Sequence, residues 1–254
     1  LTEEVIVERD GPILVVSINR PERRNAVTHV VSLGIAAAMD QLDDDDSLQV
    51  GIITGRGGSF CAGMDLHAFG DGERPEVDGR GFGGVTETPP RKPLIAAVEG
   101  FALAGGCELA LACDLIVAAN NAFFGLPEVT LGLVAGSGGL IRLPRRIPQA
   151  IALEYALTGA RMAAETAHHW GLVNRLVEPG AALSEAMALA RSISANAPLA
   201  TAMTKRIVSE SSSWPVADIW RIQAPLVDSI LASADAKEGA AAFADKRDPV
   251  WRGQ

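Results

Sequence analysis

The stretch Phe101-Ala-Leu-Ala-Gly-Gly-Cys-Glu-Leu-Ala-Leu-Ala-Cys-Asp114 decides how this chain can fold around a carboxylate. It follows the apolar run Leu94 to Val98, which predicts a buried strand, and Gly105-Gly106 opens a predicted helix over Cys107 to Ala112. Glu108 therefore lies in a first helical turn, where free backbone N–H groups and the helix dipole favour negative charge on the side chain or on a ligand. The glycines let such a ligand approach the backbone.

Strands and helices alternate around this stretch. Ile13 to Asn19 and Val50 to Thr54 are rich in β-branched residues and predict strands, and Thr28 is suited to cap an amphipathic helix that reaches about Leu42. The run Asp43 to Asp46 lacks the spacing of a calcium loop and predicts a solvated connection. This alternation indicates crossover units, so the sequence predicts an α/β fold with a largely parallel sheet.

The segment Gly70 to Pro90 interrupts the alternation. It is rich in glycine, proline and charged residues, and only Phe82 and Val85 could anchor it. We expect a mobile loop. A lid over a ligand pocket and simple disorder explain such a composition equally well.

From Gln149 onward the pattern is mainly helical, with breaks at glycine and proline. The last two apolar runs, Trp214 to Ala234 and Ala236 to Asp245, are predicted to pack outside the core, on another subunit. We therefore expect a core domain over residues 1–195 and a helical region over 196–254.

The composition excludes several classes of protein. With 254 residues, 48% of them hydrophobic and 21% charged, the chain can bury a large core and is not disordered. A net charge of −9 argues against nucleic acid and anionic membranes as partners. The three cysteines form no CxxC pair, and no metal site is predicted. Together with the lack of a long apolar run, these features predict a cytoplasmic protein.

A second glycine-rich turn, Gly55-Arg-Gly-Gly-Ser-Phe-Cys-Ala-Gly-Met-Asp-Leu66, follows the predicted strand Val50 to Thr54. It is neither a P-loop nor a dinucleotide fingerprint, because both spacings are absent. Ligands bind at the carboxyl ends of strands in open α/β sheets. The two glycine turns therefore predict one shared ligand site.

These motifs resemble those of the crotonase superfamily, and most closely those of its enoyl-CoA hydratases. The match covers nearly the whole chain, in Asn19-Arg-Pro, Ser59-Phe-Cys-Ala-Gly-Met-Asp-Leu, Gly105-Gly-Cys-Glu-Leu-Ala, Phe124-Gly-Leu-Pro-Glu and Glu238-Gly-Ala-Ala-Ala-Phe-Ala-Asp-Lys-Arg. The resemblance implies a spiral of ββα units followed by a C-terminal helical region that serves trimerisation. It also implies reversible syn addition of water to a 2-enoyl-CoA, giving 3-hydroxyacyl-CoA. Coenzyme A then arrives as the substrate thioester, and no permanently bound cofactor is expected.

The resemblance also assigns the reacting groups. The N–H groups of Met64 and Gly105 are expected to form an oxyanion hole for the thioester carbonyl, whose enolate charge such fixed donors stabilise. Glu108 is expected mainly to activate water, and Glu128 mainly to deliver the proton to the α-carbon. The N–H group of Gly136 is expected to help hold the water. One carboxylate and one carboxylic acid are needed side by side, so the two pKa values should be pushed apart or the pair should share a proton.

Coenzyme A carries phosphates, so an acidic protein must provide local cations to bind it. By resemblance, the binding residues are Arg23, Arg24 and Ala26 along the nucleotide, Ala62, Asp65 and Leu66 on the adenine side, and Phe243 and Lys246 reaching the coenzyme of a neighbouring subunit. This arrangement implies a homotrimer or homohexamer. For each arginine taken alone, solvated surface charge explains the residue as well as a phosphate contact does.

Two departures from the common hydratase pattern affect the acyl pocket. Met64 stands where a small alanine is frequent, and Val134-Ala135 replaces a more usual Ile-Pro pair. Family members resembling carnitinyl-CoA dehydratase also often carry methionine there. A carnitinyl-CoA-type dehydratase, an enoyl-CoA isomerase and a low-turnover acyl-CoA-binding homologue therefore remain alternatives. Taken alone, Glu128 after Pro127 also fits an ordinary exposed turn acid.

Overall fold

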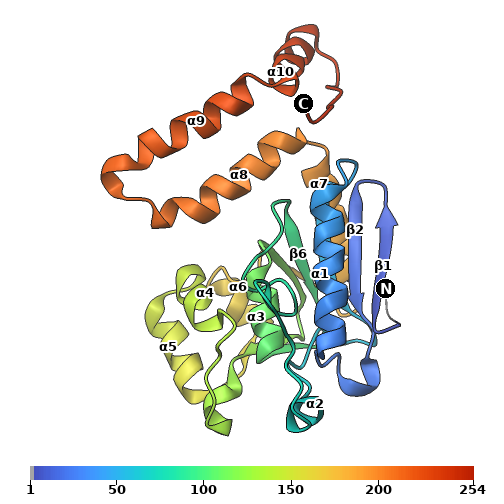
Figure 1. Ribbon diagram of the computed structural model, residues 1–254, viewed down its shortest axis with the longest axis vertical. Helices are drawn as coiled ribbons and strands as arrows, with labels where there is room; N and C mark the ends of the chain where they lie inside the picture. The colour runs from blue at the N-terminus through green and yellow to red at the C-terminus, as the bar shows by residue number, and fades with distance from the viewer. Residues whose placement is uncertain (1–2) are drawn as a thin grey trace.

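The most hydrophobic runs of the chain form a six-stranded sheet in a computed structural model that describes residues 3–254 (Figure 1). Along the sheet the strands are β1 (Val5–Asp10), β2 (Ile13–Ile18), β3 (Val50–Gly55), β6 (Leu94–Val98), β8 (Leu115–Ala119) and β11 (Arg175–Val177). Strand β1 pairs antiparallel with β2, and all the other neighbours are parallel. The predicted α/β fold with a largely parallel sheet is confirmed.

Two helices cover the two faces of this sheet. Helix α1 (His29–Asp44) packs against β1, β2 and β3, and α7 (Ala182–Ser194) packs alanines onto the other face of β2, β3, β6 and β8. The predicted cap holds, because the hydroxyl of Thr28 accepts from the N–H group of Val31 at 3.3 Å.

Helix α1 is longer than the sequence predicts. It ends at Asp44 instead of Leu42, and the carboxylate of Asp43 accepts from the backbone N–H groups of Arg91 and Lys92. The acidic run is therefore not simply a solvated connection.

A second, smaller sheet escapes the sequence analysis. It contains β7 (Phe101–Leu103), β9 (Phe123–Gly125) and β10 (Met162–Ala163), in the order β10-β9-β7. The chain leaves β6 and turns at Gly100, whose φ is 60°, into β7 before helix α3 (Gly105–Ala112) begins. The predicted direct passage from the strand into the helix is wrong.

The same pattern recurs one strand further along. Strand β8 of the large sheet is followed by β9 of the small one and then by the short helix η2 (Pro127–Leu131). Long strand, short strand and helix therefore repeat as ββα units, as the crotonase fold requires.

The segment Gly70 to Pro90 follows the short helix α2 (Leu66–Gly70) and contains a hairpin of β4 (Glu76–Val77) with β5 (Gly81–Phe82). The predicted anchors Phe82 and Val85 are both buried in the main core. Thr86 is also buried, so this segment is more than a loop with two anchors.

The second half of the chain is not wholly helical. Helices α4 (Gly139–Arg146), α5 (Gln149–Thr158) and α6 (Ala164–His169) alternate with strands β10 and β11, which the helical prediction from Gln149 missed. Both strands are short and add to sheet edges, so they carry little periodic signal. A short 3₁₀ turn, η1 (Pro21–Arg23), precedes α1.

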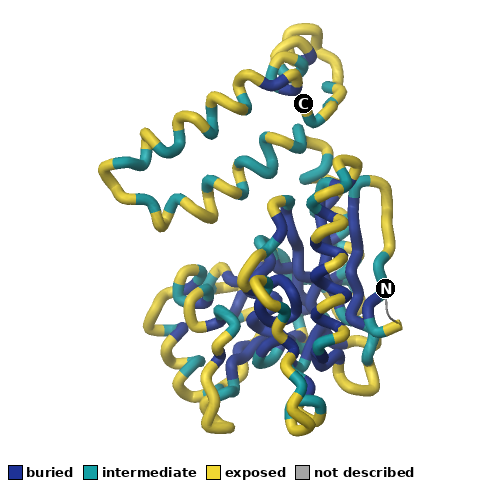
Figure 2. The backbone as a smooth tube through the Cα atoms, viewed as in Figure 1, coloured by how far each residue is buried: buried dark blue, intermediate teal, exposed yellow. Residues whose placement is uncertain are grey.

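A C-terminal arm projects from the core (Figure 1). It consists of α8 (Pro198–Glu210), α9 (Ile219–Leu231) and α10 (Ala234–Asp245), with the short turns η3 (Ser211–Ser213) and η4 (Val216–Asp218) between α8 and α9. Figure 2 shows that the arm is mostly exposed, in contrast to the sheet. Trp220 is 77% exposed and Phe243 is 88% exposed. None of the helices within residues 3–254 is long and apolar enough to cross a membrane.

Candidate active site

Three extended segments run parallel and end at one edge of the small sheet. The first contains Cys61, which forms a parallel bridge with Ala102 of β7. Strand β7 in turn pairs with β9, with Leu103 opposite Gly125. Met64, Glu108 and Glu128 all follow within a few residues of these pairings, so residues far apart in sequence reach one site.

The amides of Met64 and Gly105 lie close together. Met64 bridges Val27 through the N–H and C=O groups of its neighbours Gly63 and Asp65, so its own N–H group faces away from Val27. Gly105 is the first residue of α3 and its N–H group has no intrahelical acceptor. A Cβ atom on Gly63 would lie 3.0 Å from the nitrogen of Gly105. Among residues 3–254, neither amide donates to a protein acceptor, which leaves both available to a ligand.

Glycine is required at the start of α3 because other chain segments touch it. A Cβ atom on Gly106 would lie 2.3 Å from the carbonyl oxygen of Cys61, and one on Gly105 would lie 2.5 Å from the ring of Phe82. These contacts are shorter than any side chain tolerates, and backbone cannot easily move aside. The glycine pair therefore lets the helix approach the turn that carries Met64.

Glu108 is buried and firmly held. It is only 3% exposed, and its Oε1 atom accepts from the N–H groups of Ser137, at 2.7 Å, and Gly139, at 2.9 Å. Burial raises the pKa of Glu108 to about 7, helped by the charge of Glu128 and opposed by the two N–H donors and by Arg142. Glu108 can therefore gain or lose a proton near neutral pH.

Glu128 lies in the first turn of η2 and is half-buried. Its Oε2 atom is inaccessible to solvent and has no hydrogen-bond partner among the described residues. Burial also raises the pKa of this carboxyl group. The interpretation of Glu128 as an ordinary exposed acid is wrong. Both pKa values move in the same direction, so the site favours a bound proton on the pair over two full charges.

Gly136 lies in an exposed turn immediately before Ser137. Its N–H group donates to no acceptor within residues 3–254, whereas the next N–H group holds Glu108. The turn therefore presents one free donor beside a bound carboxylate.

The turn that carries Arg23 and Arg24 lies beside the Met64 segment. The N–H group of Ala62 donates to the carbonyl of Arg24 at 3.1 Å, and the N–H group of Val27 donates to that of Gly63 at 2.8 Å. Both arginine side chains are exposed, and neither forms an ion pair within residues 3–254. They are two free cations on an acidic protein.

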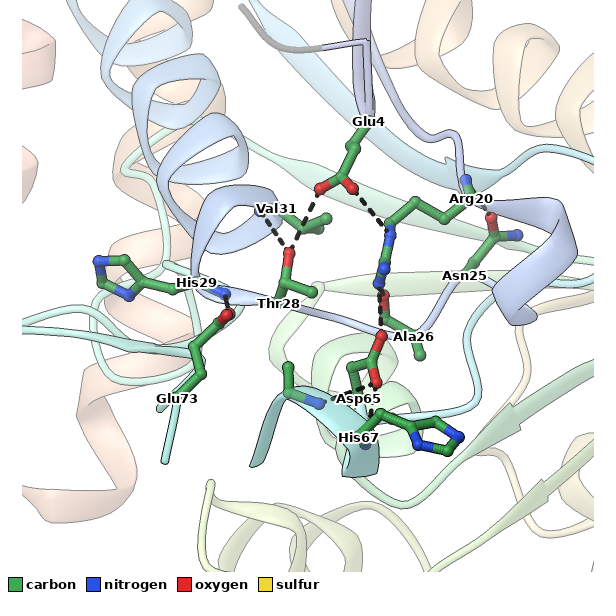
Figure 3. Close-up of polar contacts among 12 residues, drawn as sticks. Glu4, Arg20, Asn25, Ala26, Thr28, His29, Val31, Asp65, His67 and Glu73 are labelled. Carbon is green, nitrogen blue, oxygen red and sulfur yellow. Dashed lines mark hydrogen bonds and ion pairs between the residues drawn. The ribbon is translucent and has the colours of Figure 1, made fainter. Parts of the chain in front are cut away.

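A half-buried arginine that the sequence analysis did not single out ties this turn to the site (Figure 3). Arg20 lies between Glu4 and Asp65, with nitrogen–oxygen distances of 3.1 Å to each, and also donates to the carbonyl of Ala26 at 2.6 Å. Asp65 in turn caps α2 by accepting from the N–H group of His67 at 3.1 Å. Both oxygens of its carboxylate are thus engaged inside the protein.

The remaining predicted coenzyme residues fall into two groups. Ala26 is buried, Ala62 is half-buried and Leu66 is exposed, and all three lie on the segments just described. Phe243 and Lys246 lie on or just after α10, which Figure 1 places at the opposite end of the molecule from α2. A single chain therefore does not bring the two groups together.

The chain is similar to known proteins over its whole length. The family model described as enoyl-CoA hydratase/isomerase matches residues 8–254. The crystal structure of enoyl-CoA hydratase from Mycobacterium tuberculosis H37Rv superposes with a TM-score of 0.98 at 59% identity, over 100% of both chains. A carnitinyl-CoA dehydratase of Salmonella enteritidis is 45% identical over 100% of both sequences. The crystal structure of carnitinyl-CoA hydratase from Mycobacterium avium has a TM-score of 0.80 at 42% identity, again over 100% of both chains.

Proposed function

This chain belongs to the enoyl-CoA hydratase/isomerase family, a branch of the crotonase superfamily, and from that premise we propose that it adds water reversibly to a 2-enoyl-CoA thioester. The product would be a 3-hydroxyacyl-CoA. The observation that carries the proposal is the pair Glu108 and Glu128, both withdrawn from water and both with raised pKa values, beside two free backbone amides.

In the proposed mechanism the thioester carbonyl accepts from the amides of Met64 and Gly105. As water adds to the β-carbon, negative charge moves onto the carbonyl oxygen, and each fixed donor is worth roughly 3 kcal/mol at such a site. Because the donors belong to packed backbone, they need no reorganisation during the reaction.

The two carboxyl groups divide the proton transfers. Glu108 acts as the carboxylate that takes a proton from the attacking water, which the free N–H group of Gly136 helps to position. Glu128 acts as the acid that delivers a proton to the α-carbon. The raised pKa values of both groups support this exchange, because one proton can reside on the pair at neutral pH.

We propose that coenzyme A binds along the edge formed by the Arg23 turn and the Met64 segment. The free guanidinium groups of Arg23 and Arg24 would neutralise phosphate, and Ala26, Ala62, Asp65 and Leu66 would line the nucleotide. Phe243 and Lys246 would reach a coenzyme held by a neighbouring subunit, in a homotrimer or homohexamer. The exposed apolar residues of the arm support this assembly.

A second candidate function is dehydration of carnitinyl-CoA. It is favoured by the full-length similarity to carnitinyl-CoA dehydratases and by Met64 beside the acyl site. The same two carboxyl groups would serve, since dehydration is the reverse of hydration. Isomerisation, or acyl-CoA binding with little turnover, would make less use of the second carboxyl group.

Parallel rate measurements test the proposal. Loss of the conjugated enoyl-thioester absorbance from crotonyl-CoA reports hydration, and appearance of the same absorbance from carnitinyl-CoA reports dehydration. We expect turnover of crotonyl-CoA to dominate and to require both carboxyl groups. Faster turnover of carnitinyl-CoA would select the second candidate, and binding without turnover of either thioester would overturn both.

A further inference from the structure

Arg142 is a cation in the first turns of α4, a short distance from the turn that holds Glu108. Its guanidinium is partly buried, and within residues 3–254 no carboxylate lies within ion-pair distance of it. Removing an arginine from water without a counter-ion is costly. Its position therefore calls for an explanation beyond helix stability.

The guanidinium joins two segments through their carbonyl groups. One nitrogen donates to the carbonyl of Thr86, in the segment after β5, and the other lies 3.5 Å from the carbonyl of Ser137. The chain turns directly after Ser137, at Gly138, where φ is 100°. A Cβ atom on Gly138 would lie only 2.1 Å from a guanidinium nitrogen. The guanidinium thus lies directly against the turn.

This same turn delivers both donors to Glu108. The carbonyl of Ser137 faces Arg142, while the N–H groups of Ser137 and Gly139 point at the Oε1 atom of Glu108. A shift of the carbonyl would rotate the adjoining peptide groups, so the arginine and the carboxylate hold opposite sides of one short turn.

The electrostatic surroundings of Glu108 contain one opposing pair of charges. Glu128, from η2, raises the pKa of Glu108, and Arg142, from α4, lowers it. Around Arg142 itself lie Arg145 and Arg146 on the same helix and Cys113 after α3, and burial lowers the pKa of the guanidinium. Arg142 is therefore an arginine whose positive charge favours the ionised form of Glu108.

We propose that Arg142 is a positioning residue for the reaction: its fork holds the Ser137–Gly139 turn on Glu108, and its charge keeps Glu108 available as the base. The proposal rests on the proposed function, since it assigns Glu108 the task of accepting a proton from water. It goes further by linking the segment around Thr86 to the catalytic carboxylate through one side chain.

Substitutions at Arg142 test this role. Arg142→Met removes both fork and charge, Arg142→Lys keeps the charge, and Arg145→Met is the matched control, because Arg145 is exposed on the same helix. Two readouts are needed: the pH profile of kcat/KM for crotonyl-CoA, and the titration of Glu108 followed by its carboxyl infrared band in a Glu128→Gln background. Thermal unfolding establishes that each variant is folded.

We expect Arg142→Met to move the Glu108 titration upward by about one pH unit and to lower kcat roughly tenfold, with little change in KM. In Arg142→Lys, Glu108 should titrate near its wild-type pH, but only part of kcat should be recovered. Arg145→Met should match the wild type in both measurements. An unchanged Glu108 titration in folded Arg142→Met would overturn the proposal. The infrared titration needs no turnover, so an inactive wild type would count against the proposed function without deciding the role of Arg142.

Discussion

The turn around Glu108 and the C-terminal arm are built in opposite ways. Around Glu108 the chain is so closely packed that a single Cβ atom on Gly106 would overlap backbone, and the carboxylate has two backbone donors of its own. In the arm, large apolar side chains such as Trp220 and Phe243 are almost wholly exposed. The proposed reacting groups thus lie within one chain, whereas the arm presents exposed apolar surface.

This difference separates chemistry from assembly. Changes in the Glu108 turn should act on kcat and on the folding of the core, and changes in the arm should act on coenzyme binding and self-association.

The largest effect is expected at the two carboxyl groups. Glu108→Gln and Glu128→Gln should each lower kcat/KM for hydration by about 10³, since each removes one proton transfer. Steady-state kinetics with crotonyl-CoA measures this. Glu154→Gln, on the exposed face of α5, is the control and should behave as the wild type. Loss in only one of the two active-site variants would favour an isomerase with a single base.

The next effect is steric. Gly106→Ala should lower the free energy of unfolding by about 3 kcal/mol, because the added methyl group would lie 2.3 Å from the carbonyl of Cys61. Chemical denaturation measures the loss. Gly70→Ala is the control, since a Cβ atom there meets nothing within 4 Å. Equal stability of the two variants would contradict the close packing described for this turn.

The pH dependence of stability gives a comparable effect. The pKa of Glu108 is about 7 in the folded chain against an ordinary value of 4.5, so the folded state binds the proton more tightly. Stability contributed by this group is therefore present below pH 4.5 and is lost as the pH rises to 7. The free energy of unfolding of Glu108→Gln, relative to that of the wild type, should therefore rise by about 3 kcal/mol from acidic to alkaline pH. A difference in unfolding free energy between the two proteins that stays constant at all pH values would count against the buried, proton-binding carboxyl group.

The smallest effect is expected in the arm. Phe243→Ala should raise KM for the acyl-CoA about threefold and leave kcat within about twofold, because one aromatic contact is worth roughly 0.5–1.5 kcal/mol. Kinetics at several protein concentrations, together with sedimentation, separates coenzyme binding from assembly. A large fall in kcat with unchanged KM would place the arm in the chemistry after all.

Sequence alone predicts β2, β3 and β6 of the large sheet and the place of Glu108 in the first turn of a helix, because these depend on apolar runs and on a charged residue inside one of them. It does not predict β1, β8 or β11 of the same sheet. Sequence misses the small sheet, because β7 and β9 have three residues each and are too short to show the alternation of apolar and polar residues that marks a strand. That sheet is what aligns Cys61, Leu103 and Gly125, so the meeting of the two carboxyl groups is not visible in the spacing of the residues.

The partners of the catalytic groups are the other part that sequence does not supply. Ser137 and Gly139 hold Glu108 through backbone N–H groups, which any residue type could provide. Arg20 and Arg142 are half-buried, and their partners Asp65 and Thr86 lie far away in the sequence. The resemblance to a family named the reacting residues, and the structure adds what holds them.

Proton exchange at the α-carbon of a saturated acyl-CoA in deuterated water tests the central claim most directly, because it requires the oxyanion hole and Glu128 but no attacking water. Followed by NMR with butyryl-CoA, exchange should persist in Glu108→Gln, which has lost hydration, and should disappear in Glu128→Gln. Equal loss of exchange in both variants, or hydration that survives in either of them, would contradict the division of the two proton transfers between these carboxyl groups.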